Sequence, residues 1–164
     1  MKKKIILTLL VPVSLFLFNS CLIFVTEEKR VDARMEQIIS AIKDKDRETI
    51  KTLFSKRALN EVSDFASEIA YLFDFIQGDI ESWERYSWAS DGEIDHGKKT
   101  LMIRFGINIK TNEDDYRIYV MDYNMDTINP DNEGVYMMEV SRTSYKGTYL
   151  GWQERMSAGI YILE

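Results

Sequence analysis

The stretch 100–109, TLMIRFGINI, decides the fold because its apolar residues fall on every second position. The residues of this apolar series are Leu101, Ile103, Phe105, Ile107 and Ile109. Successive side chains of a β-strand point to opposite faces of the sheet, so this period predicts a strand with one face in the core. Gly106 has no side chain to pack, and this predicts a bulge or bend that lets the sheet curl.

Further strand patterns lie on both sides of this stretch. Strands are expected at residues 80–90, 116–123 and 135–142, and residues 159–163 are a candidate for a fifth. Turn signals separate them, at Asp91-Gly92, Asp95-His96-Gly97, residues 111–115 and residues 129–134. Because short turns join neighbouring strands, we expect a curved antiparallel sheet of four to five strands.

Helical periodicity precedes the strands. Apolar residues recur at spacings of three and four from Val31 to Ile42, and Asp46 is a suitable N-cap for a second, short helix. A longer third helix is expected at residues 58–76, with Gly78 as its stop signal. Three N-terminal helices packed on the sheet make residues 31–164 a single α+β domain.

The first 21 residues, MKKKIILTLLVPVSLFLFNSC, have the order of a bacterial signal peptide. Three lysines precede an apolar run at residues 5–18, and small polar residues follow. Because residues 5–25 are long enough to cross about 30 Å of hydrocarbon, an uncleaved transmembrane anchor is the alternative. In both cases the lysines stay cytoplasmic and the domain lies on the extracytoplasmic face.

The charge and the cysteine content exclude a nucleic acid partner and an internal disulfide. Without residues 1–20 the chain carries 18 basic and 27 acidic side chains, a net charge of −9. Such a surface repels phosphate backbones, so no nucleic acid partner is expected. The chain has a single cysteine, Cys21, so no disulfide is expected within it.

Ser20-Cys21 resembles the end of the lipobox of bacterial lipoproteins, although Phe18 stands where that family prefers leucine. The resemblance implies signal cleavage between Ser20 and Cys21 and a diacylglycerol on the Cys21 thiol. Residues 1–20 are then the signal peptide and residues 21–30 a lipidated tether to the cell membrane.

The predicted order of elements over residues 31–142 resembles the cone of the nuclear-transport-factor-two-like superfamily, which includes ketosteroid isomerase and many binding domains. Together with the lipobox, four short segments resemble a family of uncharacterised bacterial lipoproteins: Ala41–Asp46, Lys51–Lys56, Phe75–Gly78 and Gly134–Tyr136. The resemblance implies the cone fold, and it implies neither an activity nor functional residues.

An isomerase-like site needs a carboxylate base and a tyrosine or protonated acid across an apolar cavity. The candidates for such a pocket are Tyr86, Trp88, Arg104, Tyr116 and Asp122. Aromatic residues at strand spacing are more often core, and for Asp122 we favour an outward-facing, solvated carboxylate. Arg104 and Arg117, on neighbouring strands, are suited to clamp an anionic ligand, although pairing with acids is the commoner role.

Two other motifs favour structural roles. His96, the single histidine, lies in a predicted hairpin turn in which Gly97 takes a positive φ angle. Residues 129–134 mimic the start of a calcium-binding EF-hand loop, but Val140 stands at position twelve, where a bidentate glutamate is required. We therefore expect no catalytic residues, no metal site and no cofactor.

The sequence favours a membrane-tethered binding or interaction domain that takes an unknown small ligand or protein partner. Its expected ligand site is the mouth of the cone, between the third helix and the sheet. The alternative is a small isomerase or hydratase of the ketosteroid-isomerase type. A third hypothesis is a homodimer that associates through the outer face of the sheet.

Overall fold

The computed structural model describes residues 27–150 and 154–164. The chain divides into two compact units, Met1–Arg34 and Met35–Glu164, and every site residue discussed below lies in the second. The predicted signal peptide and Cys21 fall outside the described residues. Within the described ranges, none of the helices combines the length and apolar character that a membrane crossing requires.

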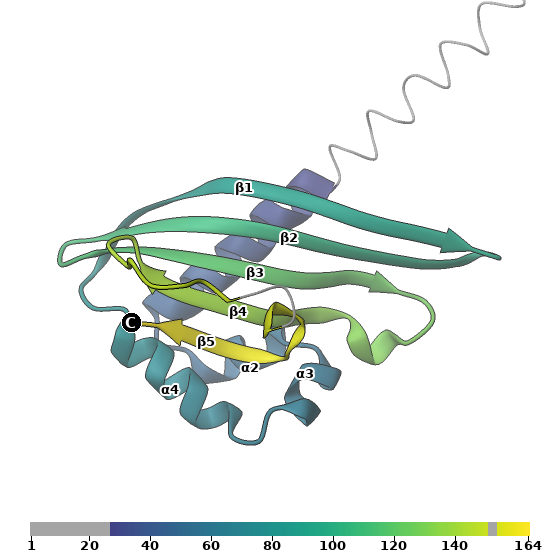
Figure 1. Cartoon of the computed structure of the whole chain (residues 1–164), viewed down its shortest axis with the longest axis horizontal. Coiled ribbons are helices and arrows are strands. Elements are labelled where there is room, and N and C mark those ends of the chain that lie inside the picture. Colours follow the sequence, from purple (N-terminus) through teal and green to yellow (C-terminus); the bar gives the residue numbers. More distant parts are fainter. Residues whose placement is uncertain (1–26, 151–153) are drawn as a thin grey trace, which may run out of the picture. The chain divides into compact units, whose positions relative to one another are not determined.

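The second unit has an α+β fold built on one mixed sheet (Figure 1). Its strands stand in chain order across the sheet. Their bounds are β1 Ile80–Asp95, β2 Lys98–Thr111, β3 Asp115–Asp126, β4 Gly134–Arg142 and β5 Gly159–Leu163. The first four strands pair antiparallel, as the turn signals predicted, and β5 joins β4 in parallel. The prediction of a purely antiparallel sheet was therefore wrong at its last strand.

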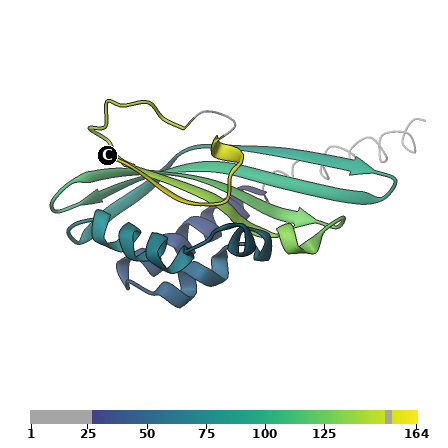
Figure 2. The same ribbon diagram turned by 60° about the horizontal axis from the view of Figure 1, so that its bottom comes forward.

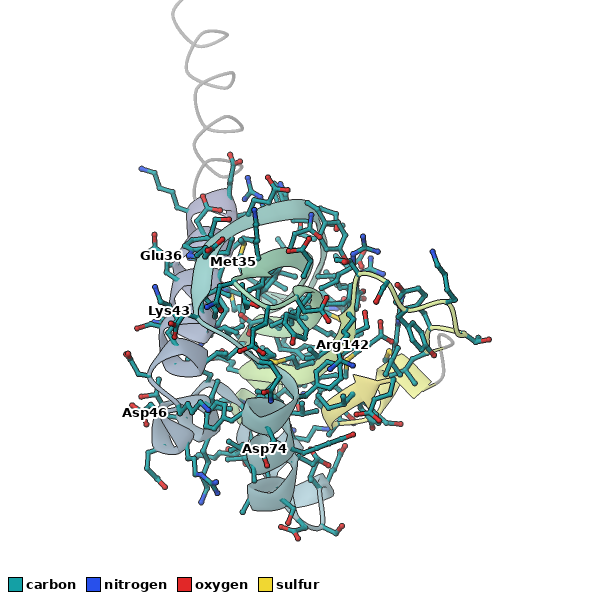
Figure 3. The ribbon with its side chains drawn as sticks, turned by 90° about the vertical axis from the view of Figure 1, so that its left-hand side faces the viewer. Met35, Glu36, Lys43, Asp46, Asp74 and Arg142 are labelled. Atoms are coloured by element: carbon teal, nitrogen blue, oxygen red, sulfur yellow. The ribbon has the colours of Figure 1, made fainter. Side chains whose placement is uncertain are left out.

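Four α-helices lie within the described residues, one more than the sequence predicted. A first helix spans residues 27–43. Three short helices follow it: α2 Arg47–Leu53, α3 Lys56–Glu61 and α4 Phe65–Phe75. In Figure 2 the three short helices cover one face of the sheet. On the first helix, Met35 is buried and Glu36 is exposed, and Figure 3 shows the two side chains beside the sheet.

The predicted third helix, residues 58–76, is divided between α3 and α4, and each of these helices begins at its own N-cap. Ser55 is the N-cap of α3 and accepts a hydrogen bond from the Ala58 backbone N–H at 3.1 Å. Asp64 is the N-cap of α4 and accepts from the Ser67 N–H at 3.1 Å. Each cap satisfies a backbone donor that has no partner inside its helix, so the chain turns at residues 62–64.

The core lies between the helices and one face of the sheet. On β2 the predicted alternation is confirmed, because Ile103, Phe105, Ile107 and Ile109 are each at most 1% exposed. The intervening positions of β2 face the other side, which we call the outer face. Residues 143–150 and 154–158 lie over the outer face, before β5 (Figure 2).

The turns between strands differ in part from the predictions. His96 and Gly97 both have positive φ angles and make the tight β1–β2 hairpin that was predicted. Asp91-Gly92 makes no turn, because β1 runs through it and pairs with β2. The bulge or bend predicted at Gly106 is found on the neighbouring strand instead, where the register shifts between Arg85 and Ser87 of β1.

Candidate functional site

Two neighbouring hollows lie on the outer face, and Arg117 lines both. The larger has a volume of about 440 Å³ and is lined by Ser82, Trp83, Glu84, Asn108, Ile109, Lys110, Asp115, Arg117 and Thr143. The smaller has a volume of about 140 Å³ and is lined by Tyr86, Arg117, Tyr119, Glu139, Ser141, Tyr149 and Arg155. Polar and charged side chains that converge in a hollow are a feature of ligand sites.

Arg117 lies on the central strand β3 and points to the outer face because its neighbours Tyr116 and Ile118 point into the core. Its guanidinium carbon is 5.1 Å from the centre of the Tyr86 ring, a cation–π distance. Its Nε is buried without a hydrogen-bond partner among the described residues. The salt bridges within the described ranges do not include Arg117.

Tyr86 reaches Arg117 because of two backbone features. The β1 bulge shifts the register between Arg85 and Ser87, and Tyr86 is the extra residue. Opposite it, Gly106 leaves room for the ring, since a Cβ on Gly106 would overlap the Tyr86 side chain. A glycine in the middle of a strand thus serves a close side-chain approach.

The smaller hollow contains a buried ion pair. Glu139 on β4 is 3% exposed, and its carboxylate accepts hydrogen bonds from Arg155 Nη2 and from the Leu150 N–H, both at 3.1 Å. The Arg155 guanidinium carbon lies 4.6 Å from the centre of the Tyr119 ring. These contacts attach Leu150 and Arg155 to the outer face.

The two tyrosines beside these arginines keep their hydroxyl protons at neutral pH. Burial raises the pKa of Tyr86, although Arg117 acts in the opposite direction. Burial likewise raises the pKa of Tyr119, against the effects of Arg104 and Arg155. Both hydroxyls can therefore donate hydrogen bonds to an anion, and neither is a base.

The five residues predicted to line one pocket do not come together. Tyr86 and Arg104 lie on the outer face. Arg104 pairs with Asp91 of β1, the commoner role foreseen for it. Trp88 pairs in register with Phe105 and is in cation–π contact with Arg85, at 5.8 Å.

Tyr116 and Asp122 lie on the core face instead. Tyr116 is fully buried, packs edge-on against Phe75 and accepts a hydrogen bond from the Gln77 N–H at 2.9 Å. Asp122 is 1% exposed, so the interpretation of a solvated carboxylate was wrong. It shares the face of Ile118 and Val120 because the strand period places it there. Neither residue lines the hollows described here.

A third hollow lies where the mouth of the cone was expected, between α4 and the start of β1. It measures about 360 Å³ and is lined by Ile42, Lys43, Lys45, Phe73, Ile76, Gly78, Asp79 and Ile80. None of the predicted pocket residues borders it. The charged residues that line it are Lys43, Lys45 and Asp79. It therefore brings together fewer polar and charged side chains than the hollows of the outer face do.

The motifs assigned to turns serve as turns. His96 is exposed and contacts Asp95 beside it. The segment that resembles an EF-hand start forms a short 3-10 helix, Pro130–Asn132, in which the Asn129 side chain accepts from the Asp131 N–H. Among residues 27–150 and 154–164, no three histidine, cysteine or acidic side chains are grouped as metal ligands are.

Sequence reasoning missed Tyr119, Glu139, Tyr149 and Arg155. Glu139 offered a signal, since it is a charged residue between Met138 and Val140 in an apolar strand. Arg155 offered none, because the tail after Thr143 has no regular pattern and its position depends on the return of the chain to β5.

A family model described as a domain of unknown function, DUF5104, matches residues 37–147. The match covers the end of the first helix, α2 to α4 and β1 to β4, and it includes every residue that lines the larger hollow. No curated protein matches the chain.

Proposed function

The chain belongs to the DUF5104 family of domains of unknown function, and from that premise we propose that it is a non-catalytic binding domain for a small organic anion. In this proposal the domain is a bacterial lipoprotein, held at the extracytoplasmic face of the cell membrane by a lipid on Cys21. The observation that carries the binding role is Arg117, a cation without an ion pair among the described residues that lines two adjoining hollows.

The leader supports the membrane anchor. The order of lysines, apolar run and Ser20-Cys21 is that of an exported lipoprotein. Two acyl chains on Cys21 would hold the protein firmly, since one chain alone gives only marginal binding. The alternative of an uncleaved anchor at residues 5–25 leads to the same location.

The arrangement of elements supports membership of the nuclear-transport-factor-two-like superfamily. Helices precede an antiparallel run of four strands and cover one of its faces, as in that cone (Figures 1 and 2). The space between the helices and the sheet is occupied by apolar side chains. We therefore assign the ligand to the outer face rather than to the cone interior.

Arg117 suits an anion because a guanidinium offers a fork of donors that matches a carboxylate or phosphate. The Tyr86 ring supports one side of this group, and the raised pKa of Tyr86 keeps its hydroxyl a donor. Such a site binds and orients an anion. These contacts favour binding over catalysis.

One observation favours the alternative of a small isomerase or hydratase. Asp122 is a carboxylate buried on the core face, as an isomerase base would be. Its possible hydroxyl partner Tyr116, however, is engaged with the Gln77 N–H at the end of α4. The buried acid is therefore explained more simply as part of the core.

The anchor is tested by mass spectrometry of the protein extracted from membranes. We expect the mass of a chain that begins at Cys21 and carries two or three acyl groups, and a Cys21→Ser variant should keep the mass of the unprocessed chain. An unmodified wild-type protein that retains Met1 would contradict lipidation.

The binding role is tested with two probes, 4-methylpentanoate and inorganic phosphate. We expect at least one to raise the melting temperature of the protein, and an Arg117→Gln variant to abolish the shift. A matched control is Arg85→Gln, which removes a positive charge from β1 at a side chain that lines neither hollow. Equal shifts in wild type and Arg117→Gln would exclude the site.

A further inference from the structure

The larger hollow carries charges of both signs that do not pair with each other. Lys110 and Arg117 are its cations, and Glu84 and Asp115 its acids. In the part of the chain that the structure describes, no ion pair joins these cations to these acids. Unpaired charges of opposite sign along one hollow match a ligand that also has two charges.

The sheet register holds three of these side chains in one row. Glu84 of β1 is opposite Asn108 of β2, and Asn108 is opposite Arg117 of β3. Neighbouring strands are about 4.8 Å apart, so the backbones that carry Glu84 and Arg117 are separated by about 10 Å. The Glu84 carboxylate and the Arg117 guanidinium thus come from backbones that are about the length of a small ligand apart, with Asn108 between them.

Asn108, in the middle of this row, has an unmet hydrogen bond. Its side-chain N–H donates to Glu84 at 3.3 Å, while its Oδ1 is buried without a partner among the described residues. Buried polar atoms normally have a partner. Asn108 thus holds the Glu84 carboxylate in the row, and this carboxylate keeps acceptor capacity for a donor on a ligand.

The hollow has room for a small ligand. Its volume of about 440 Å³ lies within the usual range of small-molecule sites, about 300–1,000 Å³. Trp83 also borders it, but it is opposite the core residue Ile109, and its side chain belongs to the other face, beside the first helix. The polar row rather than an aromatic wall therefore determines which ligand fits.

Resting on the proposed function, we infer that the ligand is a small zwitterion of the amino-acid class. Its carboxylate binds the guanidinium of Arg117, and its ammonium group donates to Glu84. Its side chain lies in the remaining volume of the hollow. The inference adds to the proposed function the requirement for a cationic group on the ligand.

The test compares three probes of the same shape by isothermal titration calorimetry of the full chain. These are L-leucine, 4-methylpentanoate, which lacks the ammonium group, and 3-methylbutylamine, which lacks the carboxylate. A thermal-shift screen of the standard amino acids first identifies which amino acid binds. If it is not leucine, the carboxylic acid and the amine of the same shape as that amino acid replace the two leucine analogues. We expect the amino acid to bind at least about tenfold more tightly than either analogue.

Two variants test which side chain of the protein binds each charged group of the ligand. Glu84→Gln should remove the preference for the amino acid over the matched acid, and Arg117→Gln should abolish binding of both. Glu93→Gln is the control, because Glu93 is an exposed acid of the same strand that lines neither outer-face hollow discussed here. It should leave the affinity and the preference unchanged.

The outcomes separate this inference from the proposed function. If the matched acid binds as tightly as the amino acid and binding depends on Arg117, the zwitterion inference is wrong and the anion site stands. If no amino acid, carboxylate or phosphate binds, both are wrong. If the amino acid is preferred but Glu84→Gln keeps that preference, the assignment of the ammonium group is overturned.

Discussion

The ring of Tyr86 lies over Gly106 of the neighbouring strand, at a position where any Cβ on Gly106 would overlap it. The contact depends on the β1 bulge and turns Tyr86 toward Arg117. One glycine therefore controls how a tyrosine borders the candidate site.

A Gly106→Ala substitution should displace the Tyr86 ring and weaken anion binding at Arg117. Stability should fall by only about 1 kcal/mol, because the atoms in the way belong to the end of a movable side chain. The measurement is a double-mutant cycle with Tyr86→Ala. In the Tyr86→Ala background, Gly106→Ala should have no further effect on binding, and two additive losses would refute the coupling.

Gly134 should tolerate alanine far less well than Gly92. Its φ angle is +123°, and a Cβ there would lie 2.8 Å from the backbone nitrogen of Ser55, which cannot move aside easily. We expect Gly134→Ala to cost more than about 2 kcal/mol in urea unfolding. Gly92, where the nearest atom is 3.6 Å away, is the control, and its alanine variant should stay within about 0.5 kcal/mol of wild type.

Tyr136 should make the protein sensitive to alkaline pH. It donates to Glu61 at 2.6 Å, and burial together with this hydrogen bond raises its pKa to about 12. Because the folded pKa exceeds the ordinary value near 10, this stabilisation is complete below about pH 10 and is lost as the pH rises toward 12.

A Tyr136→Phe variant should lose about 1 kcal/mol at pH 7 and show a shallower loss of stability between pH 10 and 12. Urea unfolding measured across this range tests the prediction. Tyr145→Phe is a suitable comparison, because the Tyr145 hydroxyl donates to Thr148 at an exposed site. If both variants follow the wild-type alkaline profile, Tyr136 is not its cause.

Removing Arg155 should loosen residues 143–150 from the outer face. Of its two donors Arg155 and Leu150, Glu139 would keep the Leu150 N–H alone for a nearly buried carboxylate, so Arg155→Gln should cost about 1–3 kcal/mol. Hydrogen exchange at the Leu150 amide should accelerate. Lys56→Gln breaks an exposed pair with Asp131 and should change the free energy of unfolding by less than about 0.5 kcal/mol.

The sequence predicted most of the elements because local patterns determine them. The alternation of β2, the His96-Gly97 hairpin and the periodicity of the first helix all depend on near neighbours. The division at Asp64 also has a local signal, the cap on Ser67, which the long apolar face of residues 58–76 obscured. Asp122 was misjudged because its charge was weighed above the strand period it shares with Val120.

The candidate site was less predictable because it is assembled from distant residues. Arg117 was recognised as an anion-binding candidate, but its neighbour Tyr86 depends on a bulge in another strand. Glu139 and Arg155 meet only because the chain crosses the outer face before β5. Neither the parallel pairing of β5 nor this crossing has a signature in the spacing of residues.

The parallel β5 has a consequence for folding during synthesis. The edge of β4 receives its partner from Gly159–Leu163, which are synthesised after the other four strands. Until these residues emerge, β4 presents open backbone donors and acceptors, as any incomplete edge does. A chain that stalls before β5 would therefore leave the edge of β4 open to pairing with other molecules.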